Sequence, residues 1–146
     1  MSAAIFEALR KDHETQRDLL ARLAETQGDT PTRRELFAML ASELEAHATA
    51  EEKSLYAALM TVDGGQEVAR HSVAEHKELS DLLDAVRETE FSSPAWLGKL
   101  AKLSERVHHH LDEEEHEVFQ QAGRILTDGH KATLEPIFSN ARAAEA

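Results

Sequence analysis

The sequence predicts an all-α protein, an antiparallel up-down four-helix bundle with a short fifth helix at the C-terminal end. Glycine and proline are scarce, with 6 and 3 copies in 146 residues, and they gather in a few breaks. Good helix formers with few β-branched runs fill the segments between these breaks. Each long segment also carries apolar residues at three- and four-residue spacing, which is typical of a helix with one buried face.

The breaks divide the chain into five expected helices. These helices span residues 2–27, 31–61, 65–91, 94–125 and 129–144. Thr30-Pro31 and Ser93-Pro94 each pair a capping residue with a proline suited to the first helical position. Pro136 lies inside the fifth segment, where we expect it to kink or interrupt the helix. We therefore expect a bundle over residues 1–126 and a C-terminal extension over 127–146 that packs on it.

The apolar stripe of each bundle helix indicates its inward face. The stripes are Phe6, Leu9, Leu20 and Leu23; Phe37, Leu40 and Leu44; Val73, Leu79, Leu83 and Val86; and Leu100, Leu103, Val107 and Val118. Because the loops between these helices are short, neighbouring helices should run antiparallel and bring the four stripes into one core.

Composition excludes several classes of function. The chain has 16 Lys and Arg against 28 Asp and Glu, a net charge of -12, which argues against nucleic acid or an anionic membrane as a partner. It has no cysteine, which excludes disulfides and thiolate chemistry. No segment approaches the ~18 apolar residues of a membrane span, and residues 1–9 lack the basic region of a signal peptide. We therefore expect a cytoplasmic location.

The two halves of the chain match at a constant offset of 63 residues. The matched pairs include Pro31 with Pro94, His13 with His76, His47 with His110, Glu51 with Glu114, Glu52 with Glu115, and Tyr56 with Phe119. A helix hairpin used twice would produce this register, with its two copies packed around a pseudo-two-fold axis.

The repeated polar residues fall on the apolar faces. His13 and His76 lie within the stripes of the first and third helices, and His47 and His110 lie within those of the second and fourth. Glu51 and Glu114 follow one turn later on the same faces. Burying four imidazoles and two carboxylates is costly unless cations compensate them. The symmetry suggests two metal ions, each with two histidines, a share in both glutamates and an oxo or hydroxo bridge. Nitrogen and oxygen ligands without sulfur suit iron, zinc, manganese or copper.

The order of these residues resembles the hemerythrin-like, or HHE, domain across residues 5–125. The motifs are Asp12-His13-Glu14, His47-xxx-Glu51-Glu52, Glu75-His76 and His110-xxx-Glu114-Glu115. The resemblance implies an antiparallel bundle with a non-haem di-iron centre. It also implies that the four histidines His13, His47, His76 and His110 are terminal ligands, and that Glu51 and Glu114 bridge the two iron ions.

Two departures separate this chain from the respiratory hemerythrins. Ser72 stands four residues before His76, where those proteins have a fifth histidine, and both expected bridges are glutamates. The pattern is closer to the members with four histidines and two glutamates, which argues against oxygen transport. His71 would be an additional ligand if its helix contained a π-bulge or started irregularly.

Further predictions concern the residues around the expected centre. His109 should lie at its boundary, whereas Asp112, Glu113 and Glu115 should point to solvent. Glu43 and Arg106 occupy matching repeat positions with opposite charge, which suggests a salt bridge between the hairpins. Tyr56 and Phe119 should pack in the core below the centre.

Three classes of function remain open at this point. The first is binding of O2, NO or peroxide at an open iron position, for binding, sensing or detoxification, with peroxide- or NO-directed redox activity as one form. The second is an iron donor or store for iron–sulfur cluster repair or iron homeostasis. The third is a metal-free helical interaction module. The sequence leaves the oligomeric state open.

Overall fold

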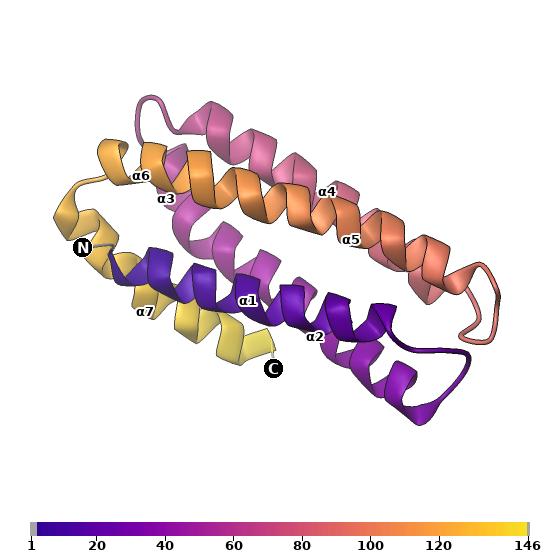
Figure 1. Cartoon of the computed structure of the whole chain (residues 1–146). Coiled ribbons are helices and arrows are strands. Elements are labelled where there is room, and N and C mark those ends of the chain that lie inside the picture. The colour runs from indigo at the N-terminus through magenta and orange to yellow at the C-terminus, as the bar shows by residue number, and fades with distance from the viewer. Residues whose placement is uncertain (1–2, 146) are drawn as a thin grey trace.

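The computed structural model describes residues 3–145, and within that range all regular structure is helical. Residues 4–24, 31–60, 66–87 and 96–125 form four helical rods. The rods lie side by side and antiparallel, and a further helix runs along one side (Figure 1). In chain order the elements are α1 (Ala4–Ala24), α2 (Pro31–Glu51), η1 (Glu52–Tyr56), α3 (Ala57–Met60), α4 (Gln66–Arg87), α5 (Trp96–Glu113), η2 (Glu114–Val118), α6 (Phe119–Ile125) and α7 (Asp128–Glu145). This arrangement confirms the predicted helical bundle.

The helix boundaries agree with the sequence at one proline and differ at another. Thr30 caps α2, because its hydroxyl accepts a hydrogen bond from the backbone N–H of Arg33 at 3.2 Å. The expected start at Pro94 is wrong: α5 begins at Trp96, since Ser93 instead accepts from the backbone of Ala95 in a turn. The first helix was expected from residue 2, which lies outside the described residues.

Helix α7 runs unbroken through Pro136, so the expected interruption does not occur. Proline removes one helical hydrogen bond, but Leu134 and Phe138 on either side are buried in the apolar core and hold the helix against the bundle. α7 packs on α1, α2 and η1, and thus covers the first hairpin. None of the described helices is long and apolar enough to cross a bilayer.

The second and fourth rods each contain a π-helical turn, η1 and η2. η1 begins directly after Glu51 and η2 begins at Glu114, the glutamates of the two His-xxx-Glu motifs. A π-turn bonds residues five apart, so it brings the residue five positions on towards the face of the glutamate. Tyr56 and Phe119 are accordingly buried, at 1% and 3% exposure.

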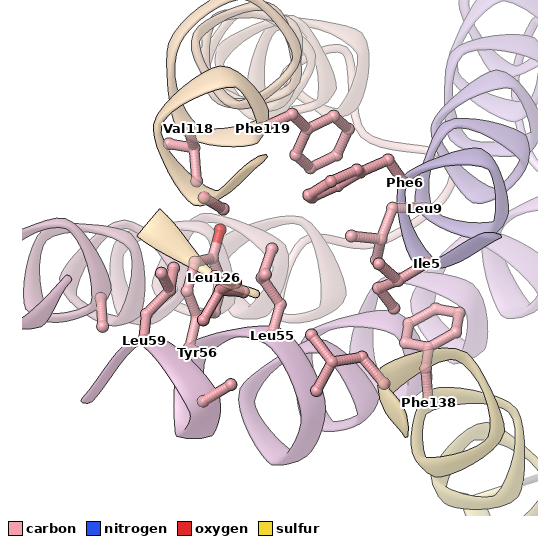
Figure 2. Packing of buried hydrophobic residues seen from close by; sticks show 14 of the residues in the cluster. Ile5, Phe6, Leu9, Leu55, Tyr56, Leu59, Val118, Phe119, Leu126 and Phe138 are labelled. Carbon is pink, nitrogen blue, oxygen red and sulfur yellow. The ribbon is translucent and has the colours of Figure 1, made fainter. Parts of the chain in front are cut away.

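Two apolar clusters fill the ends of the bundle. One gathers α3, α6, α7 and the start of α1, with Phe6, Leu55 and Phe119 among its members (Figure 2). The other joins the end of α1 to the start of α2, the end of α4 and most of α5. Val73, expected in the core, is 41% exposed. The polar residues of the predicted centre fall between the two clusters along each rod.

Candidate metal centre

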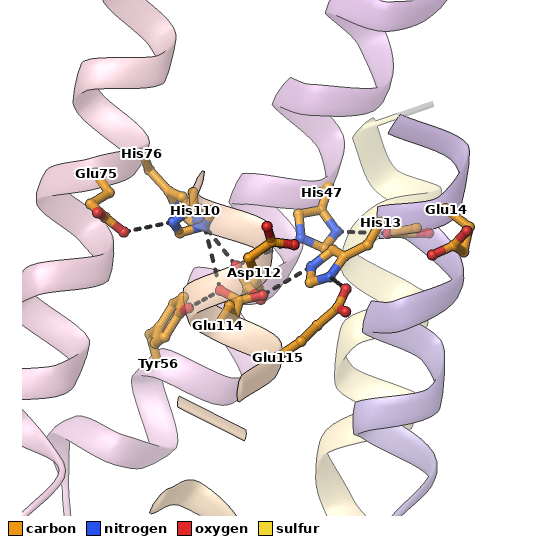
Figure 3. A network of polar contacts seen from close by, with 12 residues as sticks. His13, Glu14, His47, Tyr56, Glu75, His76, His110, Asp112, Glu114 and Glu115 are labelled. Atoms are coloured by element: carbon orange, nitrogen blue, oxygen red, sulfur yellow. Dashed lines mark hydrogen bonds and ion pairs between the residues drawn. The ribbon is translucent and has the colours of Figure 1, made fainter. Parts of the chain in front are cut away.

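The structure brings all six predicted ligand residues together in the middle of the bundle. His13 comes from α1, His47 and Glu51 from α2, His76 from α4, His110 from α5 and Glu114 from η2. All six are buried, with exposures of 0% to 8%. Figure 3 shows the four imidazoles converging on Glu114 from separate helices.

The six residues form two overlapping groups. His13 and His47 make one group, and His76 and His110 make the other, while Glu51 and Glu114 belong to both. Within each group the donor atoms lie within 4.8 Å of one another. Each hairpin therefore contributes its own pair of histidines, and the two glutamates stand between the pairs.

Seven donor atoms of this set have no hydrogen-bond partner within the described chain. They are Nε2 of all four histidines, both carboxylate oxygens of Glu51 and Oε1 of Glu114. His13 Nε2 lies 3.0 Å from Glu114 Oε1, and His76 Nε2 lies 3.1 Å from Glu51 Oε1. Buried polar atoms are ordinarily satisfied, so a converging set of unpartnered nitrogen and oxygen donors fits metal cations.

A second layer of four carboxylates holds the outer nitrogen of each histidine. The pairs are His13 Nδ1 with Glu115 (2.6 Å), His47 Nδ1 with Asp12 (2.8 Å), His76 Nδ1 with Glu52 (2.8 Å) and His110 Nδ1 with Glu75 (2.8 Å). Each imidazole thus donates from Nδ1 and turns Nε2 inward, the orientation that metal-binding histidines use. Sequence reasoning missed this layer, and the expectation that Glu115 points to solvent is wrong.

The buried charges explain the protonation of the centre without metal. Burial lowers the pKa of His13, but the carboxylates of Glu114 and Glu115 outweigh it and raise that pKa to about 9. Burial and the neighbouring Glu114 raise the pKa of Glu51 well above its usual value. Burial also opposes ionisation of Glu114, but the nearby Glu51 and His13 overcome it and lower its pKa. Burial lowers the pKa of His47 to about 4. Protons on His13 and Glu51 therefore balance the carboxylates when no cation does.

Tyr56 contacts the centre directly, which the sequence did not reveal. Its hydroxyl donates a hydrogen bond to Oε2 of Glu114. Burial and the carboxylate of Glu114 raise the pKa of the phenol well above its usual value, so the phenol keeps its proton. The repeat places Phe119 at the matching position, where its ring stacks on His13 at 5.9 Å between centroids. At this position the two halves of the centre therefore differ in one hydroxyl.

Replacing Tyr56 with phenylalanine is expected to destabilise the metal-free protein by about 1–3 kcal/mol, because a buried charged acceptor loses its donor. The number of bound ions should stay the same, since Tyr56 belongs to neither donor group. Urea unfolding and metal analysis would measure the two effects. An unchanged unfolding midpoint would show that the hydroxyl contributes nothing to holding Glu114.

Ion pairs around the centre test the predictions for two of the surrounding acidic residues, Glu43 and Asp112. Glu43 does not pair with Arg106, since Arg142 of α7 lies 2.6 Å from Glu43 and Glu78 lies 3.0 Å from Arg106. Asp112 is exposed and pairs with Arg17, as expected of a solvent-facing residue.

His71 lies apart from the six-residue centre. Its side chain is 57% exposed and lies 2.8 Å from Glu113. The π-bulge that would have turned it inward is missing from α4, which is α-helical throughout. His109 also pairs with Glu113, at 3.2 Å, with its side chain 52% exposed.

A partly open cavity of about 420 Å³ leads to the centre between α2 and α4. Three of the four histidines line it, namely His47, His76 and His110. Its other walls combine the apolar side chains of Leu44, Val73, Leu79 and Leu83 with polar ones, among them Glu45, Glu52 and Lys77. A small molecule can therefore approach the three histidines from solvent along a path that is apolar in part.

Comparisons with known proteins agree with this geometry. Residues 4–122 match the family model of the hemerythrin HHE cation binding domain. The crystal structure of a hemerythrin HHE cation binding domain-containing protein from Mycobacterium kansasii is similar, with a TM-score of 0.84 and 24% sequence identity over 99% of this chain and 90% of that one, which shows the fold. A comparison with curated protein sequences found no match. The family model covers most of the chain and includes all six central residues, so the chain belongs to the hemerythrin HHE cation-binding domain family.

Proposed function

We propose that the protein is a non-haem di-iron protein that binds a small ligand, O2, NO or peroxide, at its buried centre. The observation that carries this proposal is the partly open cavity of about 420 Å³ that is lined by three of the four histidines and several apolar side chains. The apolar part of its wall, with Leu44, Val73, Leu79 and Leu83, favours small and weakly hydrated molecules. Binding, sensing and detoxification all begin with this step.

The donor set supports a pair of iron ions. His13 and His47 would hold one ion, His76 and His110 the other, and Glu51 and Glu114 would bridge them. Imidazole and carboxylate donors without sulfur suit iron and disfavour calcium and magnesium. Iron held there would supply a redox-active, Lewis-acidic centre for the small ligand.

The chain's own residues define the conditions at this centre. The outer carboxylates fix each imidazole with Nε2 inward, so the donors are oriented before any ligand arrives. Tyr56 holds a proton at its hydroxyl beside Glu114, in the half of the centre that contains His76 and His110. Leu44, Leu79 and Leu83 limit the water that approaches along the cavity.

Anaerobic loading with Fe2+ followed by exposure to NO, O2 or peroxide tests the proposal. We expect two iron ions per chain and an absorption change that depends on the added ligand. Reversible change would assign binding or sensing, and steady consumption of the ligand would assign detoxification. Loss of iron to an acceptor without ligand binding would instead indicate an iron donor, and failure to take up metal would leave the metal-free module.

A cavity variant sharpens this test. Val73→Trp places a large ring on the cavity wall and should slow NO association several-fold without changing the iron count. Leu97→Trp is the matched control, because Leu97 is similarly exposed and lies outside this cavity. Equal association rates in the two variants would contradict access through the cavity.

A further inference from the structure

A second group of histidines and glutamates lies on the outer face of α4 and α5. His71 and Glu75 are one turn apart on α4, and His109 and Glu113 are one turn apart on α5. His71 Nε2 lies 2.8 Å from Glu113 Oε1 and 3.4 Å from Glu75 Oε2, and His109 Nε2 lies 3.2 Å from Glu113 Oε2. The donor atoms of His71, Glu75 and Glu113 lie within 4.8 Å of one another. Three donors thus meet at one place on the surface, and His109 lies beside them on the second oxygen of Glu113.

The internal repeat shows that this group is particular to the second hairpin. The matching positions in the first hairpin, 63 residues earlier, are Ala8, Asp12, Ala46 and Ala50. Three of the four donors are therefore alanine there, and α7 covers that face. On the second hairpin α7 makes no comparable packing among the described elements, and the side chains of His71 and His109 are 57% and 52% exposed.

The covered face shows how the fold neutralises the outer carboxylate. Asp12 accepts from His47 Nδ1, and Arg142 of α7 lies 3.4 Å away and brings a positive charge to the same oxygen. Glu75 is the repeat mate of Asp12. Its Oε1 accepts from His110 Nδ1, and its Oε2 faces His71 on the open surface. The position that Arg142 fills on one hairpin is thus occupied on the other by two imidazoles and a second carboxylate.

We propose that His71, Glu75, His109 and Glu113 form an outer site for Zn2+, separate from the iron of the proposed buried centre. Two imidazoles and two carboxylates match the ligand number and type that Zn2+ and similar ions prefer. The ion takes the place on the open face that the guanidinium of Arg142 takes on the covered face. Glu75 connects this outer ion to the buried centre, since its other oxygen holds His110.

Zinc uptake by the iron-loaded protein tests the outer site. After incubation with Zn2+ and dialysis, the unmodified chain should retain one zinc ion in addition to its iron. The double variant His71→Ala/His109→Ala should keep the same iron content and lose the zinc. Both side chains are more than half exposed, so the fold should tolerate their removal. His108→Ala/His116→Ala, which removes two other histidines of the same rod, should retain the zinc.

A second variant separates this inference from the proposed di-iron centre. Glu51→Gln/Glu114→Gln removes the carboxylates of the buried centre, and this variant should still bind one zinc ion. Adding His71→Ala/His109→Ala to the same variant should abolish zinc binding. Equal zinc retention with and without His71 and His109, or no retention in the unmodified chain, would overturn the outer site. A low iron content alone would instead count against the proposed function.

Discussion

Replacing either Glu51 or Glu114 with glutamine is expected to abolish binding of both ions, whereas replacing one histidine with alanine should leave one ion bound. The difference follows from the geometry, because both glutamates belong to both donor groups and each histidine belongs to one. Glutamine keeps the shape of the side chain but removes the charge and one acceptor oxygen, so it cannot bridge two cations. Metal analysis of Fe2+-loaded protein should therefore fall from two ions to none in Glu51→Gln and Glu114→Gln, and to one in His47→Ala.

Glu117→Gln is the matched control for this comparison. Glu117 lies on η2, close in sequence to Glu114, but its side chain is exposed. The control should keep both ions, and circular dichroism should show the same helical content in every variant. If the glutamine variants and the histidine variants lose the same amount of metal, the glutamates are not shared and the two groups are independent sites.

The six central residues could be predicted because periodicity determines the face of a helix. His13, His47 and their repeat mates share a stripe with leucines and valines, and Glu51 follows His47 by one turn. When the apolar stripes of the four helices meet in a bundle, these residues must lie in its interior. The internal repeat predicted that the donors belong to one centre, since it implied that each hairpin contributes the same donors.

The outer carboxylates could not be predicted by the same rule. Glu52 and Glu115 each follow an inward glutamate directly, and a step of about 100° per residue turns such a neighbour away from the core. The π-turns alter the direction of the chain at these points, and each side chain reaches the outer nitrogen of a histidine on another helix. One signal was present: all four carboxylates repeat at the same 63-residue offset as the histidines, Asp12 with Glu75 and Glu52 with Glu115.

The sequence also could not predict which helices α7 contacts. Its apolar residues predict that it packs somewhere, but periodicity does not say on which hairpin. Because it docks on the first, Arg142 reaches Asp12 and Glu43, and the hypothesis of a Glu43–Arg106 pair fails. The internal symmetry of the bundle is thereby broken, and the second hairpin keeps an open face.

Raising the pH from 6.5 to 9 is expected to destabilise the metal-free protein by about 3 kcal/mol through His13 alone. Its pKa is raised from 6.5 in the unfolded chain to about 9 in the fold, so the protonated imidazole stabilises the fold fully below pH 6.5 and this contribution disappears as the pH passes 9. Glu51 acts in the same direction, because its raised pKa means that ionising it costs stability as the pH rises. The lowered pKa of His47 acts below this window, where acid destabilises the fold between pH 6.5 and about 4.

The metal-loaded protein should lose much less stability over the same range. A cation replaces the protons on His13 and Glu51, so these groups no longer titrate there, and the stabilisation by metal should grow from pH 6.5 to 9. Urea unfolding with and without Fe2+ under anaerobic conditions would measure this difference. Metal-free His13→Gln should lose most of the pH dependence, whereas His116→Gln, at an exposed position, should retain it. If His13→Gln unfolds with the pH dependence of the unmodified chain, the buried carboxylates are neutralised by some group other than His13, and metal binding would displace a proton from there.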